Sequence, residues 1–235
     1  MKIIILAGGL GTRISEETSD KPKPMVLLDS KPILWHLLSI FAEQGYNEFI
    51  IATGYKSEII EEWSSNLKEN WLVETLFTGQ DTQTGGRIKK CMQHLAGQRV
   101  MATYGDGLAN IDLGKLIDFH LHHGKKATLT AVRPPARFGV LESTNGLITN
   151  FGEKNQTDAG WINGGFFVLE PEVEEYIEGA SEPFETGAIP RLVAEKNLMA
   201  YHHAGFWQPM DTLREKQDLS KLASERPPVW LRLEE

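Results

Sequence analysis

Two kinds of hydrophobic pattern alternate along the chain. Short runs of β-branched and apolar residues are typical of buried strands, and apolar residues repeated every three or four positions are typical of amphipathic helices. Runs of the first kind predict strands at residues 2–7, 49–52, 72–77, 100–104 and 127–132. Patterns of the second kind predict helices at residues 32–41, 57–63, 86–95, 113–122, 171–177 and 189–196, and a last helix after Asp211.

This alternation predicts an α/β fold. Strands that alternate with helices form a mostly parallel sheet whose two faces are covered by helices. We expect one domain over residues 1–235, because no repeat, low-complexity tract or linker breaks the chain. Residues 138–168 carry more strand and turn signals, with turns at 145–146 and 164–165, and indicate a smaller strand-rich part within a mixed sheet.

The first strand runs directly into a glycine-rich loop, Gly8-Gly9-Leu10-Gly11-Thr12-Arg13. Glycines let backbone N–H groups approach an anion closely, and the N-terminus of a following helix would add positive charge. A dinucleotide fingerprint would need Gly or Ala where Ile14 stands, and a Walker loop would need a lysine that is absent here. The pattern favours a loop that wraps a nucleoside triphosphate; the alternative is a tight turn that uses glycine for geometry only.

Composition narrows the possible partners. The chain has 235 residues and a net charge of −8, which argues against general nucleic-acid binding. One cysteine, Cys91, excludes an internal disulfide and is expected to be a small helix residue and no nucleophile. The apolar start is too short for a secretory signal, and no run approaches the length of a membrane span. We therefore expect a cytoplasmic protein without a nucleic-acid or membrane partner.

Several motifs, read together, resemble one enzyme family. The glycine loop followed by Lys21-Pro22-Lys23-Pro24-Met25 resembles the signature of the sugar-phosphate nucleotidylyltransferases. Within them, the chain is similar to the glucose-1-phosphate cytidylyltransferases at residues 15–18, 54–56, 84–87, 103–107, 137–139, 162–167 and 205–214. The resemblance implies a single Rossmann-like nucleotidyltransferase domain, with a nucleotide-binding half at about 1–110, a sugar-phosphate half at about 111–211 and a C-terminal helix and tail at 212–235.

The resemblance also implies a reaction. CTP and a sugar 1-phosphate, most simply α-D-glucose 1-phosphate, would give a CDP-sugar and pyrophosphate for nucleotide-sugar and polysaccharide synthesis. The attacking phosphate is already an anion, so charge neutralisation and alignment would supply most of the catalysis. The alternatives are UTP, dTTP or another phosphorylated acceptor as substrate, or a catalytically silent nucleotide-binding regulatory subunit. The protein is expected to be a homo-oligomer.

Four residues are expected to carry the transfer chemistry. By resemblance, Asp106 and Asp211 hold Mg²⁺, which prefers hard carboxylate ligands. Taken singly, Asp106 would suit a turn and Asp211 a helix N-cap. Lys23, fixed between two prolines, and Arg13 are the expected catalytic cations that neutralise the triphosphate.

The remaining expected contacts fall into two groups. The nucleotide-binding group is Leu6, Ala7, Gly8, Gly9, Gly11, Thr12, Thr82, Gly86, Arg87 and Gly105. Arg87 is the hypothesised selector of CTP, because a guanidinium fork can donate to O2 and N3 of cytosine, while the alternative is a surface arginine at a helix start. The sugar-phosphate group is Glu153, Lys154, Asn163, Gly164 and Glu185. The Asn-Gly-Gly stretch would also suit a bulge or turn.

The chain departs from the family pattern in three places. Asn155 stands where the family has proline, and residues 184–189 differ from the family's Trp-Glu-x-Glu-Pro-Leu. Both changes lie on the sugar side of the expected site. The chain is also short between Trp63 and Thr78, where the family carries an extra segment that contributes to subunit contacts.

Overall fold

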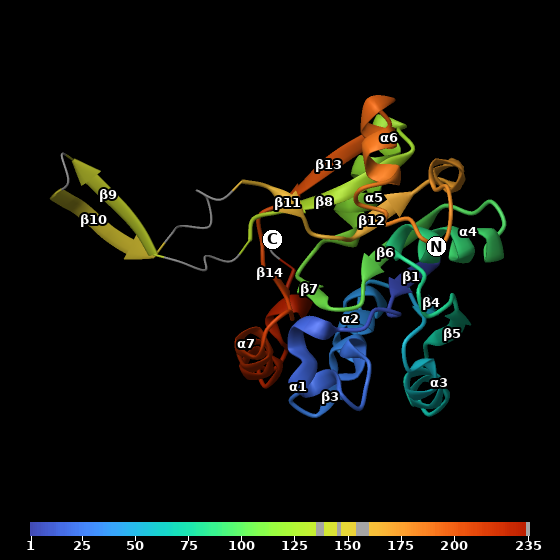
Figure 1. Cartoon of the computed structure of the whole chain (residues 1–235), viewed down its shortest axis with the longest axis horizontal. Helices are drawn as coiled ribbons and strands as arrows, with labels where there is room; N and C mark the ends of the chain where they lie inside the picture. Colours follow the sequence, from blue (N-terminus) through green and yellow to red (C-terminus); the bar gives the residue numbers. More distant parts are fainter. Residues whose placement is uncertain (135–138, 145–146, 154–159, 234–235) are drawn as a thin grey trace.

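The computed structural model describes residues 1–134, 139–144, 147–153 and 160–233. Within these residues an eight-stranded sheet forms the centre of the molecule, in the order β11-β8-β12-β6-β1-β4-β5 with β13 added beside β8 (Figure 1). Its strands are β1 (Ile3–Leu6), β4 (Glu48–Thr53), β5 (Leu72–Phe77), β6 (Val100–Tyr104), β8 (Ala127–Val132), β11 (Ile162–Asn163), β12 (Phe167–Leu169) and β13 (Leu198–His203).

Most neighbours in this sheet are parallel. β1 lies between β4 and β6, with Ile3 opposite Phe49 on one side and Met101 on the other. β12 runs antiparallel to β6 and β8, and β11 antiparallel to β8. The predicted mostly parallel mixed sheet is confirmed. As a result, the carboxyl ends of β1, β4, β5 and β6 meet at one edge of the sheet, the usual place for a ligand in such folds.

Successive side chains along a strand point to opposite faces of the sheet, so the sheet has a separate hydrophobic core on each face. Ile3 and Ile5 face one side, and Ile4 and Leu6 the other. The first side is covered by α2 (Ile33–Ala42), α3 (Ser57–Ser65), α5 (Leu113–His123) and α7 (Leu213–Ala223). The second side is covered by α4 (Thr84–His94), the 3₁₀ helix η4 (Pro171–Tyr176) and α6 (Ala188–Ala194).

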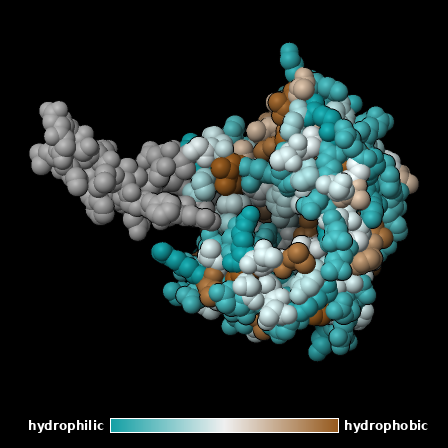
Figure 2. Space-filling view, viewed as in Figure 1, coloured by the Kyte–Doolittle hydropathy of each residue, from teal (hydrophilic) through white to brown (hydrophobic). Residues whose placement is uncertain are grey.

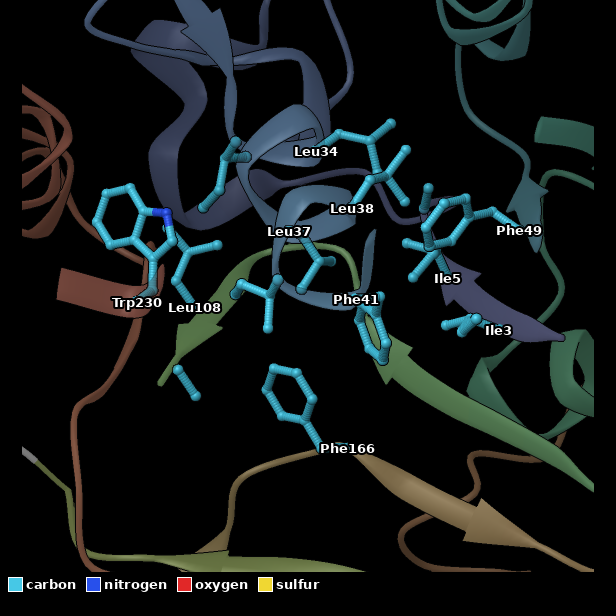
Figure 3. Packing of buried hydrophobic residues seen from close by; sticks show 14 of the residues in the cluster. Ile3, Ile5, Leu34, Leu37, Leu38, Phe41, Phe49, Leu108, Phe166 and Trp230 are labelled. Carbon is cyan, nitrogen blue, oxygen red and sulfur yellow. The ribbon is translucent and has the colours of Figure 1, made fainter. Parts of the chain in front are cut away.

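The larger core joins distant parts of the chain (Figure 3). The rings of Phe41 on α2 and Phe166 before β12 stack at 5.8 Å between centroids. Trp230, on the 3₁₀ helix η5 (Val229–Leu231), is 1% exposed and packs in the same cluster as Leu108. The C-terminal segment therefore contributes to the core that supports the first strands.

The segment after the glycine loop forms short helical turns. Gly11 is left-handed, with φ +65°, and is followed by the 3₁₀ turn η1 (Thr12–Ile14) and the four-residue α1 (Ser15–Thr18). Any positive charge that a helix N-terminus adds at the loop therefore comes from these short turns. The next residues form the 3₁₀ helix η2 (Lys23–Met25) and the short hairpin of β2 (Leu27–Leu28) and β3 (Lys31–Pro32).

Two further pairings involve short strands. β7 (Gly107–Ala109) pairs antiparallel with β14 (Trp207–Pro209), and neither strand was predicted from the sequence. β9 (Gly139–Thr144) and β10 (Leu147–Glu153) form an antiparallel pair within the predicted strand-rich part. The turn expected at 145–146 lies outside the described residues.

The surface is mixed in character. The face in Figure 2 is mainly hydrophilic, with hydrophobic side chains scattered over it. Among the described residues, no helix combines the length and apolar composition needed to cross a bilayer.

Candidate active site

A cleft of about 550 Å³ opens at the carboxyl edge of the sheet, between the glycine loop, the segment after β5 and the end of β6. It brings together most of the expected site residues: Leu6, Ala7, Gly8, Gly9, Gly11, Thr12, Arg13, Lys23, Thr82, Arg87, Gly105, Asp106 and Asp211. Its lining also includes residues that were not among the expected contacts, namely Leu10, Pro24, Gln80, Asp81, Gln83, Thr84 and Tyr104. Four of these residues follow β5, whose carboxyl end lies at the same edge of the sheet. Their position after a predicted strand could have indicated that they line the site.

One lysine links the two expected metal ligands. Lys23 Nζ donates to Asp106 Oδ2 at 2.6 Å and to Asp211 Oδ1 at 2.7 Å. The Lys23 residue is 9% exposed. Its burial alone would lower its pKa, but the two carboxylates outweigh that effect and raise the pKa, so the side chain remains an ammonium ion.

Backbone pairing explains how two carboxylates so far apart in the sequence meet. Asp106 lies in the two-residue turn between β6 and β7, and the antiparallel pairing of β7 with β14 places Pro209 opposite Gly107. The Met210 N–H then donates to the Asp106 carbonyl at 2.9 Å. Asp211, one residue further on, is thereby held beside Asp106.

Asp211 is not a helix cap. The N-cap of α7 is Thr212, which forms a capping box with Glu215. The Asp211 carboxylate instead accepts from Lys23 and from Arg13 Nη1, the latter at 3.0 Å. Burial would raise the pKa of Asp211, but these two cations hold it below its usual range. The single-residue alternative of an N-cap is therefore wrong.

The residues present fit a divalent cation. Asp106 and Asp211 supply hard oxygen donors, and both carboxylates already converge on a single cationic atom, Lys23 Nζ. Lys23 begins η2 between Pro22 and Pro24, and the Val26 N–H donates to its carbonyl at 3.1 Å. Its backbone is thus fixed by local structure, while its side chain reaches across the cleft.

Arg87 occupies a different environment from the one expected. It is 4% exposed, and its Nη1 donates to Thr53 O at 2.8 Å, Thr78 Oγ1 at 2.6 Å and Gly79 O at 3.0 Å. Its Nη2 donates to Gly8 O at 2.9 Å and to Gln80 O at 3.3 Å. The amino groups expected to face a base therefore face the protein's own oxygens, and the surface-arginine alternative is wrong. Burial lowers the pKa of this guanidinium from its usual value.

Two predicted glycines lie outside the cleft lining. A Cβ on Gly86 would lie 2.6 Å from Ala180 Cα, and one on Gly164 would lie 2.5 Å from Val132 Cγ1. These glycines are needed because other segments pack directly on their backbones. Gly164 also accepts from Trp207 Nε1 at 2.9 Å, which connects it to β14.

The other sugar-side residues lie next to the cleft. Tyr104 donates to Glu185 Oε1 at 2.6 Å and accepts from Asn163 Nδ2 at 3.0 Å. Tyr104 lines the cleft, so Glu185 and Asn163 lie one hydrogen bond beyond its wall. Lys154 and the side chain of Glu153 lie outside the described residues.

The single cysteine is buried on a helix, as expected. Cys91 on α4 is fully buried, and burial raises the pKa of its thiol to about 12. A neutral, inaccessible thiol fits the expected packing role.

Comparison with known proteins decides the family. The family model described as nucleotidyl transferase matches residues 2–216. This chain belongs to the nucleotidyl transferase family. Its membership confirms the enzyme class indicated by the motifs, and the cleft is the candidate active site of a nucleotidyltransferase.

The sequence of this nucleotidyltransferase is similar to those of two curated relatives over nearly their whole length. It is 44% identical to glucose-1-phosphate cytidylyltransferase of Salmonella typhimurium, over 98% of both chains. It is 39% identical to the probable glucose-1-phosphate cytidylyltransferase of Bacillus subtilis, over 98% of this chain and 99% of that protein. The fold matches a solved UDP-glucose pyrophosphorylase in its apo form with a TM-score of 0.74, at 17% identity over 96% of this chain and 98% of that one.

Proposed function

We propose that this nucleotidyltransferase transfers a cytidylyl group from CTP to α-D-glucose 1-phosphate, giving CDP-glucose and pyrophosphate. The observation that carries the proposal is the Lys23 ammonium, which is held between Asp106 and Asp211 in the cleft that the glycine loop also lines. The names of the two cytidylyltransferase relatives support the choice of nucleotide and sugar.

In this proposal the triphosphate lies along residues 8–13, where the backbone is open. A Cβ on Gly9 would meet nothing within 4 Å, so phosphate oxygens could approach the chain there. Arg13 is largely exposed, whereas Lys23 is buried, and both cations line the same cleft. Together they would offset the repulsion between the triphosphate and the incoming sugar phosphate.

We propose that Asp106 and Asp211 hold Mg²⁺ during the reaction. Bound there, the ion would neutralise charge on the phosphate oxygens. No general base is needed, because the attacking oxygen belongs to a phosphate that is already ionised near neutral pH. The chain's own part is to align the two anions and to hold Lys23 close to the reacting groups.

Different segments of the chain would bind the two substrates. Residues 1–110 would bind the nucleotide, residues 111–211 the sugar phosphate, and residues 212–235 would support the site from α7 and the tail. By resemblance to the cytidylyltransferases we also propose a cytoplasmic homo-oligomer. A silent regulatory subunit is the weaker alternative, because a protein that only binds nucleotide has no need of the Lys23, Asp106 and Asp211 cluster.

A substrate grid tests the proposal. Pyrophosphate release would be measured with CTP, UTP, dTTP, GTP and ATP against a panel of sugar 1-phosphates, with and without Mg²⁺. We expect the largest kcat/KM for CTP with glucose 1-phosphate and no turnover without a divalent cation. A higher kcat/KM with UTP or dTTP would replace CTP in the proposal. No turnover with any pair would favour the regulatory subunit.

A further inference from the structure

Glu185 accepts hydrogen bonds from the hydroxyl groups of two residues that line the cleft. Thr84 Oγ1 donates to Glu185 Oε2 at 2.6 Å, and Tyr104 Oη donates to Glu185 Oε1 at 2.6 Å. Thr84 begins α4 on the nucleotide side, and Tyr104 ends β6 immediately before Gly105 and Asp106. Both residues line the cleft, and the mechanism above uses neither.

The direction of every proton in this network is fixed by its neighbours. The Phe184 N–H donates to Thr84 Oγ1 at 2.8 Å, so the Thr84 hydroxyl proton is available for Glu185. Asn163 Oδ1 accepts from the Gly165 N–H at 3.0 Å, which orients the amide so that its Nδ2 donates to Tyr104 at 3.0 Å. The Tyr104 proton must then point to Glu185.

Glu185 thus receives one hydroxyl proton from Thr84 and one from Tyr104. Both oxygens of Glu185 therefore accept hydrogen bonds, and the lone pairs that remain can only accept more. A half-buried anionic acceptor beside the cleft suits a hydroxyl or ammonium donor and repels a second anion.

We propose that Thr84 and Tyr104 are positioning residues that hold Glu185 as the acceptor for a hydroxyl of the sugar 1-phosphate. The inference rests on the proposed transfer to a sugar 1-phosphate and specifies its acceptor class. Neutral sugars, and amino sugars with an ammonium group at that position, are substrates, and sugars that carry a carboxylate there are rejected. Through the Glu185 carboxylate, Thr84 also connects the proposed nucleotide-binding part of the site to the sugar-binding part.

Steady-state kinetics of five purified variants test this assignment. They are Tyr104→Phe, Thr84→Val, Thr84→Ser, Glu185→Gln and the double variant Tyr104→Phe/Glu185→Gln, assayed with CTP and glucose 1-phosphate. Tyr104→Phe keeps the ring that packs against Phe167 at 5.8 Å. Tyr201→Phe is the matched control, because Tyr201 lies on β13 against Phe119 and away from the cleft lining.

Loss of a hydrogen bond to a charged group should raise the KM for glucose 1-phosphate about tenfold in Tyr104→Phe and Thr84→Val, with the KM for CTP changed less than about twofold. Thr84→Ser should stay closer to wild type than Thr84→Val. The double variant should be no worse than Glu185→Gln alone, because Tyr104 acts through Glu185. An unchanged KM for glucose 1-phosphate in Tyr104→Phe, or additive losses in the double variant, would overturn the assignment.

A second substrate separates this inference from the proposed function. Wild type should use glucuronic acid 1-phosphate at least about a hundredfold less well than glucose 1-phosphate, and Glu185→Gln should reduce that ratio about tenfold. A ratio unaffected by Glu185→Gln contradicts the inference while leaving the transferase activity intact. A wild-type enzyme inert with every nucleotide and sugar overturns the proposed function, and this inference with it.

Discussion

A Cβ atom placed on Gly8 would lie 2.0 Å from Nη1 of Arg87. The guanidinium fills the space beside the loop backbone and donates to the Gly8 carbonyl at 2.9 Å. Gly54, across the same guanidinium, would bring a Cβ within 2.6 Å of Nη1. The first glycine of the loop is therefore required by a buried side chain, whatever the loop binds.

Gly8→Ala should destabilise the protein and displace the loop. Overpacking against a buried group costs about 1–3 kcal/mol, and the KM for CTP should rise at least about tenfold as the loop shifts. Chemical denaturation and steady-state kinetics would measure the two effects. Gly9→Ala is the matched control for stability, because a Cβ on Gly9 meets nothing within 4 Å. Equal stability losses in the two variants would contradict the explanation.

Arg87→Lys should weaken binding of every nucleotide in parallel. Lysine cannot make the five hydrogen bonds to Gly8, Gln80 and residues 53, 78 and 79, so the cleft wall loses its support. We expect the KM for CTP and for UTP to rise together by about tenfold or more, with their ratio unchanged. Competition assays with both nucleotides would check this. A collapse of the preference for CTP would show instead that Arg87 reads the base.

Lys23→Met should separate cation binding from turnover. The ammonium and a divalent cation need the same oxygens of Asp106 and Asp211, so removing the ammonium should strengthen Mn²⁺ binding in the absence of nucleotide. Turnover should fall at least about a hundredfold, because the cation that faces the triphosphate is lost.

Calorimetric titration with Mn²⁺ gives a readout for this variant that does not depend on activity. Lys21→Met serves as the control, because Lys21 lies two residues away and its ammonium approaches Asp20 at 4.0 Å. Mn²⁺ affinity in Lys23→Met equal to or below that of wild type would show that the ammonium and the ion do not compete. Near-normal turnover would remove Lys23 from the mechanism.

Acid should destabilise the protein through a buried histidine network. The Lys125 N–H donates to His123 Nδ1, so His123 Nε2 carries its proton toward Thr128 Oγ1, which leaves Thr128 to donate to His120 Nδ1. His120 Nε2 then donates to Glu170. The network requires both rings to be neutral, and burial lowers the pKa of each.

Because the folded-state pKa values lie below the unfolded value, this contribution to stability is complete above about pH 6.5 and is lost as pH falls from there toward the folded values. The melting temperature should therefore fall between about pH 6.5 and 5, and His120→Gln should show a shallower fall from a lower starting value. His36 is also buried with a lowered pKa, so part of the fall in melting temperature with pH should remain in His120→Gln. His122→Gln, on the exposed side of α5, should follow wild type. Parallel curves for wild type and His120→Gln would exclude the network as the cause.

Local patterns predicted the parts of the structure that local forces decide. The run 2–7 and the period of residues 32–41 gave β1 and α2, because buried strands and amphipathic helices have their own spacing. β13, β7 and β14 were missed: β13 is an edge strand with exposed positions, and the other two have three residues each. Such strands are defined by their partners, which no short window contains.

The same distinction applies to the site. Lys23 was found because prolines flank it and a glycine loop precedes it. The environment of Arg87 was not foreseen, because it depends on carbonyls supplied by β4 and the segment after β5. Tyr104 lies within the motif at 103–107 but was not named as a contact, because a tyrosine at the end of a buried strand resembles a core residue.

The pairing of β7 with β14 has a consequence for how the protein is made. Asp106 leaves the ribosome long before Asp211, and the two carboxylates meet only after β14 has docked on β7. A nascent chain that has completed β1, β4 and β6 holds the glycine loop and Lys23 but lacks half of the carboxylate pair. If the carboxylate pair acts as proposed, the site is completed late in synthesis, when β14 has paired with β7.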